Sequence, residues 1–222
     1  MADRVVIFGA GGLGSELLQT IKDAKAAGRD IDCVGFVVDP AFPAPAAVQG
    51  IPVSTALAPF AGDPSVSFIV AIGDPAARRR IAAAIESAAG PRFATIVHPG
   101  SWVGDTVTMG PGTLVLGLSS ITTNIRIGRH VAIGPQVAVA NGCVLDDYCT
   151  LAPRVALAGH VHLEEGCEVG IGAVVLPRRK VGRWSVIGGG AVVVRPVSPE
   201  TKVAGVPARE IGARPDDGER GC

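Results

Sequence analysis

The fold is decided by a stretch that reads ITTNIRIGRHVAIGPQVAVANGCVL from Ile121 to Leu145. An aliphatic residue recurs in it at every sixth position, and the same phase extends without a break on both sides, from Val97 to Val193. A hexapeptide period is typical of a coil with three short strands per turn of roughly 18 residues, each strand pointing its aliphatic side chain inward. Residues 96–212 are therefore predicted to form an all-β, left-handed parallel β-helix.

A second inward position lies two residues before each aliphatic one and holds mostly small or β-branched residues. Cys143, Cys149 and Cys167 all occupy it, so we predict that they are packing residues, because buried thiols behave as small hydrophobes. No pair of the five cysteines has the C-x-x-C spacing of a zinc or redox site, and no metal site is predicted. Glycine directly follows seven of the aliphatic residues, where it is expected to ease tight corners.

The first 95 residues change to an alternation of strands and helices. An apolar run over residues 5–8 leads into the glycine-rich segment GAGGLG at 9–14 and then into helical periodicity. Glycines in this order make a tight turn that presents N–H groups and a helix N-terminus to a phosphate. Two further apolar runs, residues 33–38 and 67–72, end in Asp39 and in Gly73-Asp74. We predict a small Rossmann-like α/β domain over residues 1–95 that binds a nucleotide or a nucleotide-linked acceptor. A plain tight turn without a ligand stays an open alternative.

Charge and composition narrow the classes of partner. Twenty Lys plus Arg balance twenty Asp plus Glu, with four His, so no excess charge is available to attract nucleic acid or anionic lipid. No apolar run approaches the roughly 18 residues of a membrane span, and the opening Met-Ala-Asp-Arg is unlike a signal peptide. We therefore expect a cytoplasmic protein with a small-molecule partner and no membrane contact. Residues 213–222 are expected to form a flexible tail.

The combined pattern resembles the two-domain hexapeptide acyltransferases of the NeuD/PglD-like group, which comprises sialic acid O-acetyltransferases and bacillosamine or perosamine N-acetyltransferases. The segments that carry the resemblance are GAGGLG at 9–14, HPGSWVGD at 98–105, VGIGAVVLP at 169–177, IGGGAVV at 187–193 and GVPAR at 205–209. The resemblance implies an N- or O-acyltransferase that uses acetyl-CoA or another acyl-CoA and acts on a small polar acceptor such as a nucleotide-activated amino sugar. It also implies a homotrimer with active sites between subunits.

The resemblance further assigns residues to roles. Gly159 is expected to offer its N–H to the thioester carbonyl, a contact of the kind that stabilises a developing oxyanion. The residues expected to line the coenzyme are Thr150, Ala158, Gly159, Ile171, Gly189, Val206, Pro207 and Arg209. Those expected to hold the acceptor are Gly9, Gly11, Gly12, Leu13, Gly14, Asp39, Gly73, Asp74 and Gly134.

The chain departs from the group at the catalytic base. Where the group has a segment like V-x-H-D/E-C, this chain reads Val139-Ala140-Asn141-Gly142-Cys143, and an amide cannot accept a proton at neutral pH. Gly134, Leu13 and Thr150 also replace polar residues of the group.

Three explanations stay open for the missing base. His160 lies one residue beyond the position that stacks on Asn141 and is the best substitute base that the sequence offers. Alternatively, the acceptor is an amine that arrives unprotonated, and Asn141 only forms a hydrogen bond with it. Otherwise the chain is a catalytically silent paralogue that binds the coenzyme or nucleotide. His130 and His162 occupy outward positions and are expected to face solvent.

Overall fold

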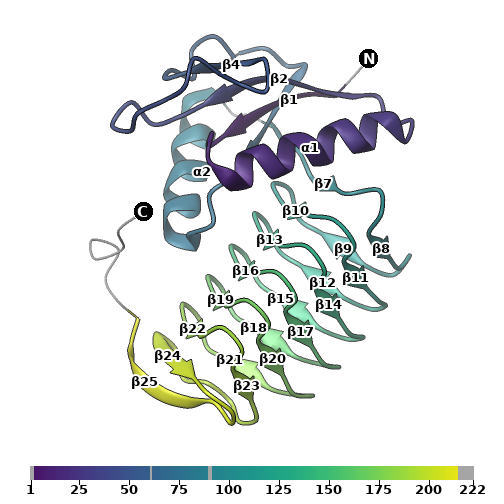
Figure 1. Cartoon of the computed structure of the whole chain (residues 1–222), viewed down its shortest axis with the longest axis vertical. Helices are drawn as coiled ribbons and strands as arrows, with labels where there is room; N and C mark the ends of the chain where they lie inside the picture. Colours follow the sequence, from purple (N-terminus) through teal and green to yellow (C-terminus); the bar gives the residue numbers. More distant parts are fainter. Residues whose placement is uncertain (1–2, 61, 90–91, 215–222) are drawn as a thin grey trace.

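The computed structural model describes residues 3–60, 62–89 and 92–214. They form a small α/β domain seated on one side of a β-helix, with the first helix lying between the sheet and the coils (Figure 1). None of the helices in these described ranges is long and apolar enough to cross a membrane.

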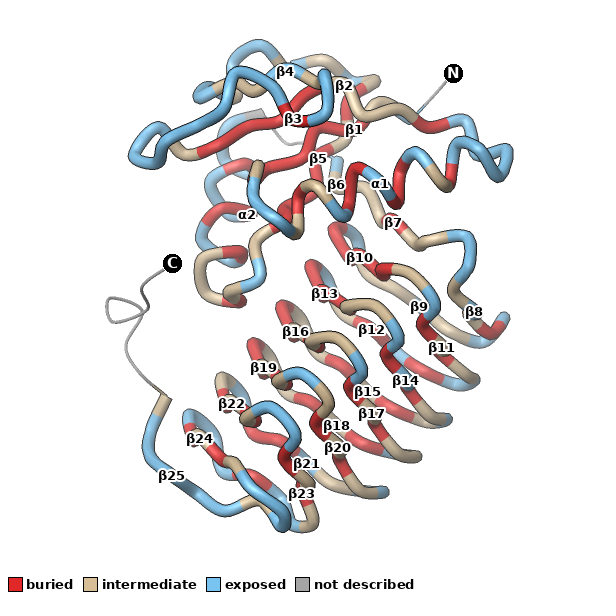
Figure 2. Tube along the Cα trace, viewed as in Figure 1, coloured by how far each residue is buried: buried red, intermediate tan, exposed pale blue. Residues whose placement is uncertain are grey.

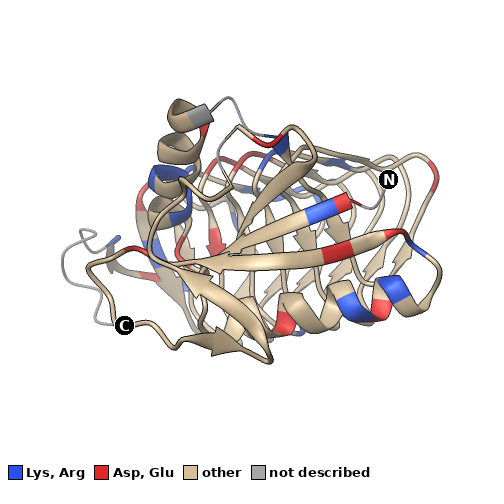
Figure 3. Cartoon of the chain, turned by 90° about the horizontal axis from the view of Figure 1, so that it is seen from above, with Lys and Arg blue, Asp and Glu red and all other residues tan. Residues whose placement is uncertain are grey.

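The N-terminal domain is a six-stranded sheet with a helix on each face. Its strands are β1 (Asp3–Phe8), β2 (Ile31–Val37), β3 (Ala47–Val48), β4 (Ile51–Ser54), β5 (Val66–Val70) and β6 (Arg92–Phe93), in the order β3-β4-β2-β1-β5-β6. Only β3 and β4 pair antiparallel. The helix α1 (Gly12–Ala26) packs Leu17 on Val5 and Ile7, whereas α2 (Pro75–Ala89) packs Ile81 on the other sheet face, with Val6. Charges of both signs are interspersed over this domain (Figure 3).

The predicted left-handed parallel β-helix is confirmed. Its strands have two residues each, of which the first points outward and the second is the aliphatic residue of the hexapeptide period. Every such residue from Val115 to Val193 is buried in one continuous core, and the buried positions recur along each coil (Figure 2).

The strands of the β-helix form three faces. Face 1 consists of β7 (Ile96–Val97), β10 (Leu114–Val115), β13 (Ala132–Ile133), β16 (Thr150–Leu151), β19 (Glu168–Val169) and β22 (Val186–Ile187). Face 2 consists of β8 (Trp102–Val103), β11 (Ser120–Ile121), β14 (Ala138–Val139), β17 (Ala156–Leu157), β20 (Val174–Val175) and β23 (Val192–Val193). Face 3 consists of β9 (Thr108–Met109), β12 (Arg126–Ile127), β15 (Val144–Leu145), β18 (His162–Leu163) and β21 (Lys180–Val181).

The corners of the coil depend on a left-handed backbone at a position that the glycine pattern did not indicate. From residue 112 to residue 190, every sixth residue has positive φ, including Asn124 (57°), Gln136 (59°) and His160 (60°). The glycines that directly follow the aliphatic residues have another function. A Cβ on Gly134 would lie 2.9 Å from the backbone nitrogen of Pro153 in the next coil. The expectation that these glycines ease the corners is therefore wrong, because they allow successive coils to stack closely.

Face 1 is covered by the N-terminal domain of the same chain. Its outward residues Ile96, Leu114 and Ala132 are buried in one cluster with Leu17 and Ile21 of α1. Because apolar residues from both parts share this core, the two domains hold a fixed arrangement. Within the described part of the chain, faces 2 and 3 carry no such cover.

A buried arginine of α2 ties the two domains together. Arg78 is 1% exposed, and burial lowers its pKa to about 10, so the guanidinium is charged at neutral pH. It donates six hydrogen bonds, to the carbonyl oxygens of Ile72, Gly73, His130, Tyr148 and Cys149 and to Thr150 Oγ1. This role could not be predicted from the sequence, where Arg78 is one of three consecutive arginines on a basic helix.

The GVPAR segment forms the turn of a hairpin that closes the last coil. The strand β24 (Thr201–Ala204) extends face 1 beyond β22, and β25 (Arg209–Ala213) returns antiparallel to it. Part of the predicted tail is ordered: Ala213 ends β25, and the Arg214 side chain, 8% exposed, donates to the Gly166 and Trp184 carbonyls. Residues 215–222 lie outside the described residues.

Candidate active site

Asn141, Gly159 and His160 come together at the edge between faces 2 and 3. Asn141 follows β14, and Gly159 occupies the same corner one coil later. The His160 N–H donates to the Asn141 carbonyl oxygen at 2.9 Å. The Asn141 Oδ1 atom lies 3.2 Å from the point where a Cβ on Gly159 would stand. The absence of a side chain at Gly159 therefore leaves room for the exposed Asn141 carboxamide beside it.

Two hydrogen-bonding groups at this edge are unused. Among the described residues, neither the Gly159 N–H nor the Asn141 carboxamide has a protein partner. Corner residues lie outside the strand ladder, so their N–H groups need other partners. At two equivalent corners a carboxylate accepts this bond, from the Arg129 N–H to Asp147 and from the Arg183 N–H to Glu164. What distinguishes this corner is the neutral carboxamide next to the free donor. Together they offer one N–H donor and one amide to a bound molecule.

The His160 ring packs against Gly142, where a Cβ would collide with the imidazole. The side chain is exposed, and no carboxylate orients it within the described part of the chain. The sequence thus placed His160 correctly beside Asn141, but among the described residues no hydrogen bond orients the imidazole. Its role as a base stays a prediction.

The core cysteines are buried, as predicted. Cys143, Cys149 and Cys167 are 0% exposed. Cys143 Sγ donates to the Ala158 carbonyl oxygen at 3.2 Å, which fixes the backbone directly before Gly159. Burial raises the pKa of Cys143 and of Cys149, so these thiols stay protonated and are poor nucleophiles.

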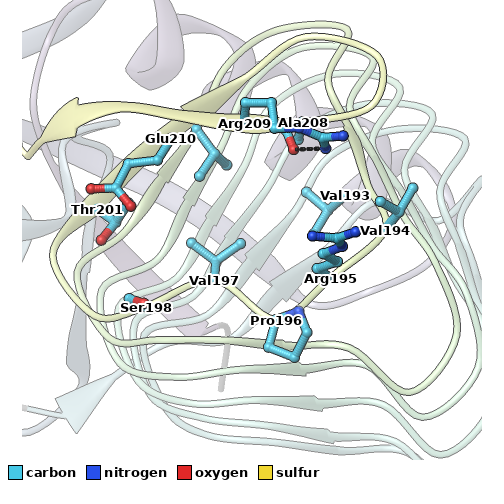
Figure 4. A pocket seen from close by; sticks show the side chains of 11 residues that line it. Val193, Val194, Arg195, Pro196, Val197, Ser198, Thr201, Ala208, Arg209 and Glu210 are labelled. Carbon is cyan, nitrogen blue, oxygen red and sulfur yellow. Dashed lines mark hydrogen bonds between the residues drawn. The ribbon is translucent and has the colours of Figure 1, made fainter.

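The other predicted coenzyme residues lie along face 2 and its far edge, with one exception. Ile171 is 59% exposed, and a Cβ on Gly189 would stand 3.2 Å from it. Val206, 73% exposed, lies in the hairpin turn, followed by Pro207 in a cis peptide bond. Arg209 and Glu210 line a hollow of about 180 Å³ that the hairpin forms against Val193 and Val197 of the last coil (Figure 4).

Thr150 is the exception among the predicted coenzyme residues. It belongs to face 1, where its hydroxyl donates to the Gly73 carbonyl at 2.8 Å and accepts from Arg78. The structure thus places it in the junction between the domains and not with Gly159.

The predicted acceptor residues of the N-terminal domain gather at the carboxyl ends of β1, β2 and β5. The Gly9 N–H donates to the Val37 carbonyl, and Gly11 and Gly12 stand open at the start of α1. Leu13 is half-buried against the α1 core. Gly14 packs so closely that a Cβ would collide with the Gly9 carbonyl. This arrangement leaves a helix N-terminus facing the loops that follow β2 and β5, where a phosphate group can bind.

The two acidic residues of these loops also have local structural roles. Asp39 Oδ1 accepts from the Ala41 N–H at 3.0 Å. Asp74 Oδ1 caps α2 by accepting from the Ala77 N–H at 2.8 Å. The Gly73 carbonyl accepts from Arg78 and from Thr150 of the β-helix, so this loop has a fixed position over face 1. Gly134 lies apart from these loops, at the edge between faces 1 and 2.

The two uncovered faces differ in charge. Face 2 presents Trp102, Ser120, Ala138, Ala156, Val174 and Val192 outward, none of them charged. Face 3 presents Thr108, Arg126, Val144, His162 and Lys180. His162 Nε2 lies 2.8 Å from Asp146 Oδ2, a pairing that the sequence analysis did not indicate. Across the described ranges no three His, Cys, Asp or Glu side chains are grouped as a metal site requires.

The expectation that His130 faces solvent is wrong. It is 0% exposed, stacked on Tyr148 with ring centroids 5.3 Å apart and edge-on to Phe93 at 4.5 Å. Neither ring nitrogen has a hydrogen-bond partner among the residues that the structure describes, and burial lowers the pKa of His130 to about 4. The N-terminal domain covers this corner, which the hexapeptide period alone cannot indicate.

Known proteins resemble the chain in both domains. Residues 4–85 match the PglD N-terminal domain. The GDP-perosamine N-acetyltransferase of Escherichia coli O157:H7 is 34% identical over 157 residues, which cover 67% of this chain and 69% of that protein. The serine acetyltransferase of Salmonella typhimurium is 36% identical over 97 residues, and this match spans 39% of the chain but only 36% of that enzyme.

A solved structure extends the likeness over nearly the whole chain. It is a variant of perosamine N-acetyltransferase from Caulobacter crescentus, with one histidine replaced by asparagine, in complex with CoA and GDP-perosamine. It is 29% identical and covers 94% of this chain and 96% of its own, with a TM-score of 0.80. With its β-helix, its glycine loop and this coverage, the chain belongs to the NeuD/PglD-like family of hexapeptide-repeat acetyltransferases.

Proposed function

We propose that the chain transfers an acetyl group from acetyl-CoA to an amine or hydroxyl of a nucleotide-activated amino sugar. The acceptor attacks the thioester carbonyl carbon directly, the carbon–sulfur bond breaks, and CoA leaves as its thiol. The observation that carries the proposal is the corner of Asn141 and Gly159, where an unused N–H lies beside a free carboxamide. An N–H aimed at the developing oxyanion stabilises the transition state.

The relatives support a sugar nucleotide as the acceptor. The relative from E. coli acts on GDP-perosamine, and the variant from C. crescentus is bound to CoA and GDP-perosamine although it carries asparagine in place of a histidine. In that variant asparagine does not prevent either molecule from binding, which supports a substrate-binding role for Asn141 in this chain. In our proposal its carboxamide oxygen accepts a hydrogen bond from the attacking amine, while the loops around Gly11, Asp39 and Asp74 hold the nucleotide.

We also propose that three copies assemble into a ring. A cyclic trimer needs two different surfaces on each protomer, one for each neighbour. Face 1 is taken by the chain's own N-terminal domain, so face 2 of one protomer faces face 3 of the next, with the edge at Asn141 toward the axis. Each β-helix is a three-sided prism, and the three edges at Asn141 meet at the axis of the ring. Between two neighbours this leaves a wedge-shaped cleft, whose walls are face 2 of one protomer and face 3 of the next. Gly159 lies deep in this wedge, and Ile171 and Gly189 lie at its mouth, which fits a long coenzyme lying along face 2.

Two substitutions at Gly159 test the proposed donor. Gly159→Pro removes the N–H, and the fold tolerates proline there, because Pro177 occupies the same corner one coil later. Gly159→Ala adds a Cβ at the same place but keeps the N–H. We expect proline to lower kcat about 10²- to 10³-fold relative to alanine. The assay follows thiol release from acetyl-CoA with a panel of nucleotide amino sugars. Equal rates for the two variants would exclude the donor role.

The same assay decides between an enzyme and a silent binding protein, the alternative that Asn141 keeps open. Wild-type protein that binds CoA tightly but releases no thiol with any acceptor would overturn the proposed activity. Asn141→Ala should raise the KM for the acceptor without weakening CoA binding.

A further inference from the structure

An imidazole on face 3 is held in one orientation by a carboxylate. His162 Nε2 lies 2.8 Å from Asp146 Oδ2, and the other Asp146 oxygen accepts from Arg126 Nη2 at 3.1 Å. Because a carboxylate only accepts hydrogen bonds, Nε2 carries the proton and Nδ1 keeps its lone pair. The His162 side chain is 37% exposed. It is therefore an oriented proton acceptor that a ligand can reach, whereas the His160 ring has no such partner.

Within one protomer this imidazole does not serve the edge at Asn141. His162 points outward from β18, and it leans toward Asp146, which follows β15 at the end of face 3 away from Asn141. Its neighbours above and below in the sheet are Val144 and Lys180. His162 thus belongs to the surface of face 3 and not to the corner.

In the ring described above, face 3 of each protomer forms the second wall of the wedge over its neighbour's face 2. The outward residues of face 2 are uncharged, so that wall supplies no group able to take a proton. Face 3 of the neighbour contributes His162, which lies among the charged side chains of Arg126, Asp146, Glu164 and Lys180. The two walls therefore have complementary chemistry, with the backbone donor on one and the oriented base on the other.

We propose that His162, oriented by Asp146, takes the proton of the acceptor bound at the Asn141–Gly159 edge of the neighbouring protomer. This inference rests on the proposed acetyl transfer and on the ring. As the amine nitrogen bonds to the acetyl carbon and the carbon–sulfur bond breaks, the amine proton passes to His162 Nδ1 and from there to the departing CoA thiolate. The products are the acetamide and CoA, and His162 returns to its neutral form.

Single substitutions test whether His162 takes the proton. His162→Gln should lower kcat about 10²- to 10⁴-fold with little change in the KM for acetyl-CoA. Asp146→Asn should give a smaller loss, since it disturbs only the orientation of the ring. Thr108→Ala, an exposed change on the same face, is the matched control and should leave kcat unchanged. For His162→Ala, added imidazole should restore part of the rate, which a merely structural role would not allow.

Several results would overturn the assignment while leaving the proposed function intact. If the wild type is active and His162→Gln keeps full activity, His162 is excluded as the proton acceptor. If activity is lost only in His160→Gln, His160 is the proton acceptor instead. No turnover by the wild type would instead refute the proposed function itself.

Mixed oligomers test whether His162 acts on a neighbour. Gly159→Pro and His162→Gln chains are each expected to be inactive, so they are unfolded together and reassembled. In a ring where one wall comes from each protomer, random mixing restores about one site in four. Recovered activity near that level supports the inference. Absence of recovery, with mixed assembly verified by a mass tag on one chain, shows that both residues act within one protomer and overturns it.

Discussion

Arg78→Met should weaken the docking of the N-terminal domain on the β-helix. The guanidinium is the only donor to the His130 and Tyr148 carbonyl oxygens among the described residues, and both accept at 2.7–2.8 Å. A buried carbonyl that loses its partner costs about 1–3 kcal/mol. Methionine keeps much of the side-chain volume and avoids the cost of burying a cation, which offsets part of the loss. We therefore expect the free energy of unfolding to fall by about 2–5 kcal/mol.

Urea unfolding followed by circular dichroism and tryptophan fluorescence measures this loss. Trp102 and Trp184 are the two tryptophans of the chain, and both lie in the β-helix, so fluorescence reports on that part and circular dichroism on the whole. Arg80→Met is the matched control: Arg80 is exposed on the same helix, and its loss should cost less than about 0.5 kcal/mol. If the free energy of unfolding of Arg78→Met lies within about 1 kcal/mol of the wild-type value, the hydrogen bonds of Arg78 do not hold the domains together.

Three further outcomes follow from the packing. Burial lowers the pKa of His130 to about 4, so between pH 6.5 and 4 only the unfolded chain gains this proton, and the free energy of unfolding falls by up to about 3 kcal/mol as the pH drops. His130→Phe should reduce this dependence of stability on pH. If the urea midpoints of the wild type and of His130→Phe fall in parallel over this pH range, the prediction is wrong. Gly134→Asn should lower the free energy of unfolding by about 1–3 kcal/mol, because its Cβ would collide with the Pro153 backbone. Gly172→Asn, at an open corner with a left-handed backbone, should lower it less in the same urea titration. The three core cysteines should resist iodoacetamide until the chain unfolds, as peptide mass analysis would reveal; rapid labelling of folded protein would contradict their burial.

The β-helix could be predicted because its information is local. Each aliphatic residue from Val115 to Val193 points inward in the structure, as the six-residue spacing requires. The position of Gly159 beside Asn141 also followed from sequence, since 18 residues make one coil and place the two at the same corner. The short strands β3, β4 and β6 escaped prediction, because two to four residues carry too little periodic signal.

The chemistry of the candidate site was only partly visible. Sequence indicated Asn141, Gly159 and His160, but it predicted that His130 and His162 alike face solvent. The structure separates them: His130 is buried, His160 has an exposed ring without a partner, and His162 is held by Asp146. Thr150 was likewise expected near the coenzyme and instead bonds Gly73 across the domain junction. These differences arise from contacts between residues far apart in the chain.

By itself, the sequence determined the coil, its inner residues and the stacking of positions 18 apart, because a repeating unit fixes its own register with its nearest neighbours. The tertiary structure alone decided which outward residues are covered, since the N-terminal domain docks on face 1 through α1 and Arg78. That docking buries His130 and leaves faces 2 and 3 free. The physical reason is that the hexapeptide repeat specifies the same backbone and the same inward positions on all three faces. Only a contact with residues outside the repeat can bury one face and leave the others exposed.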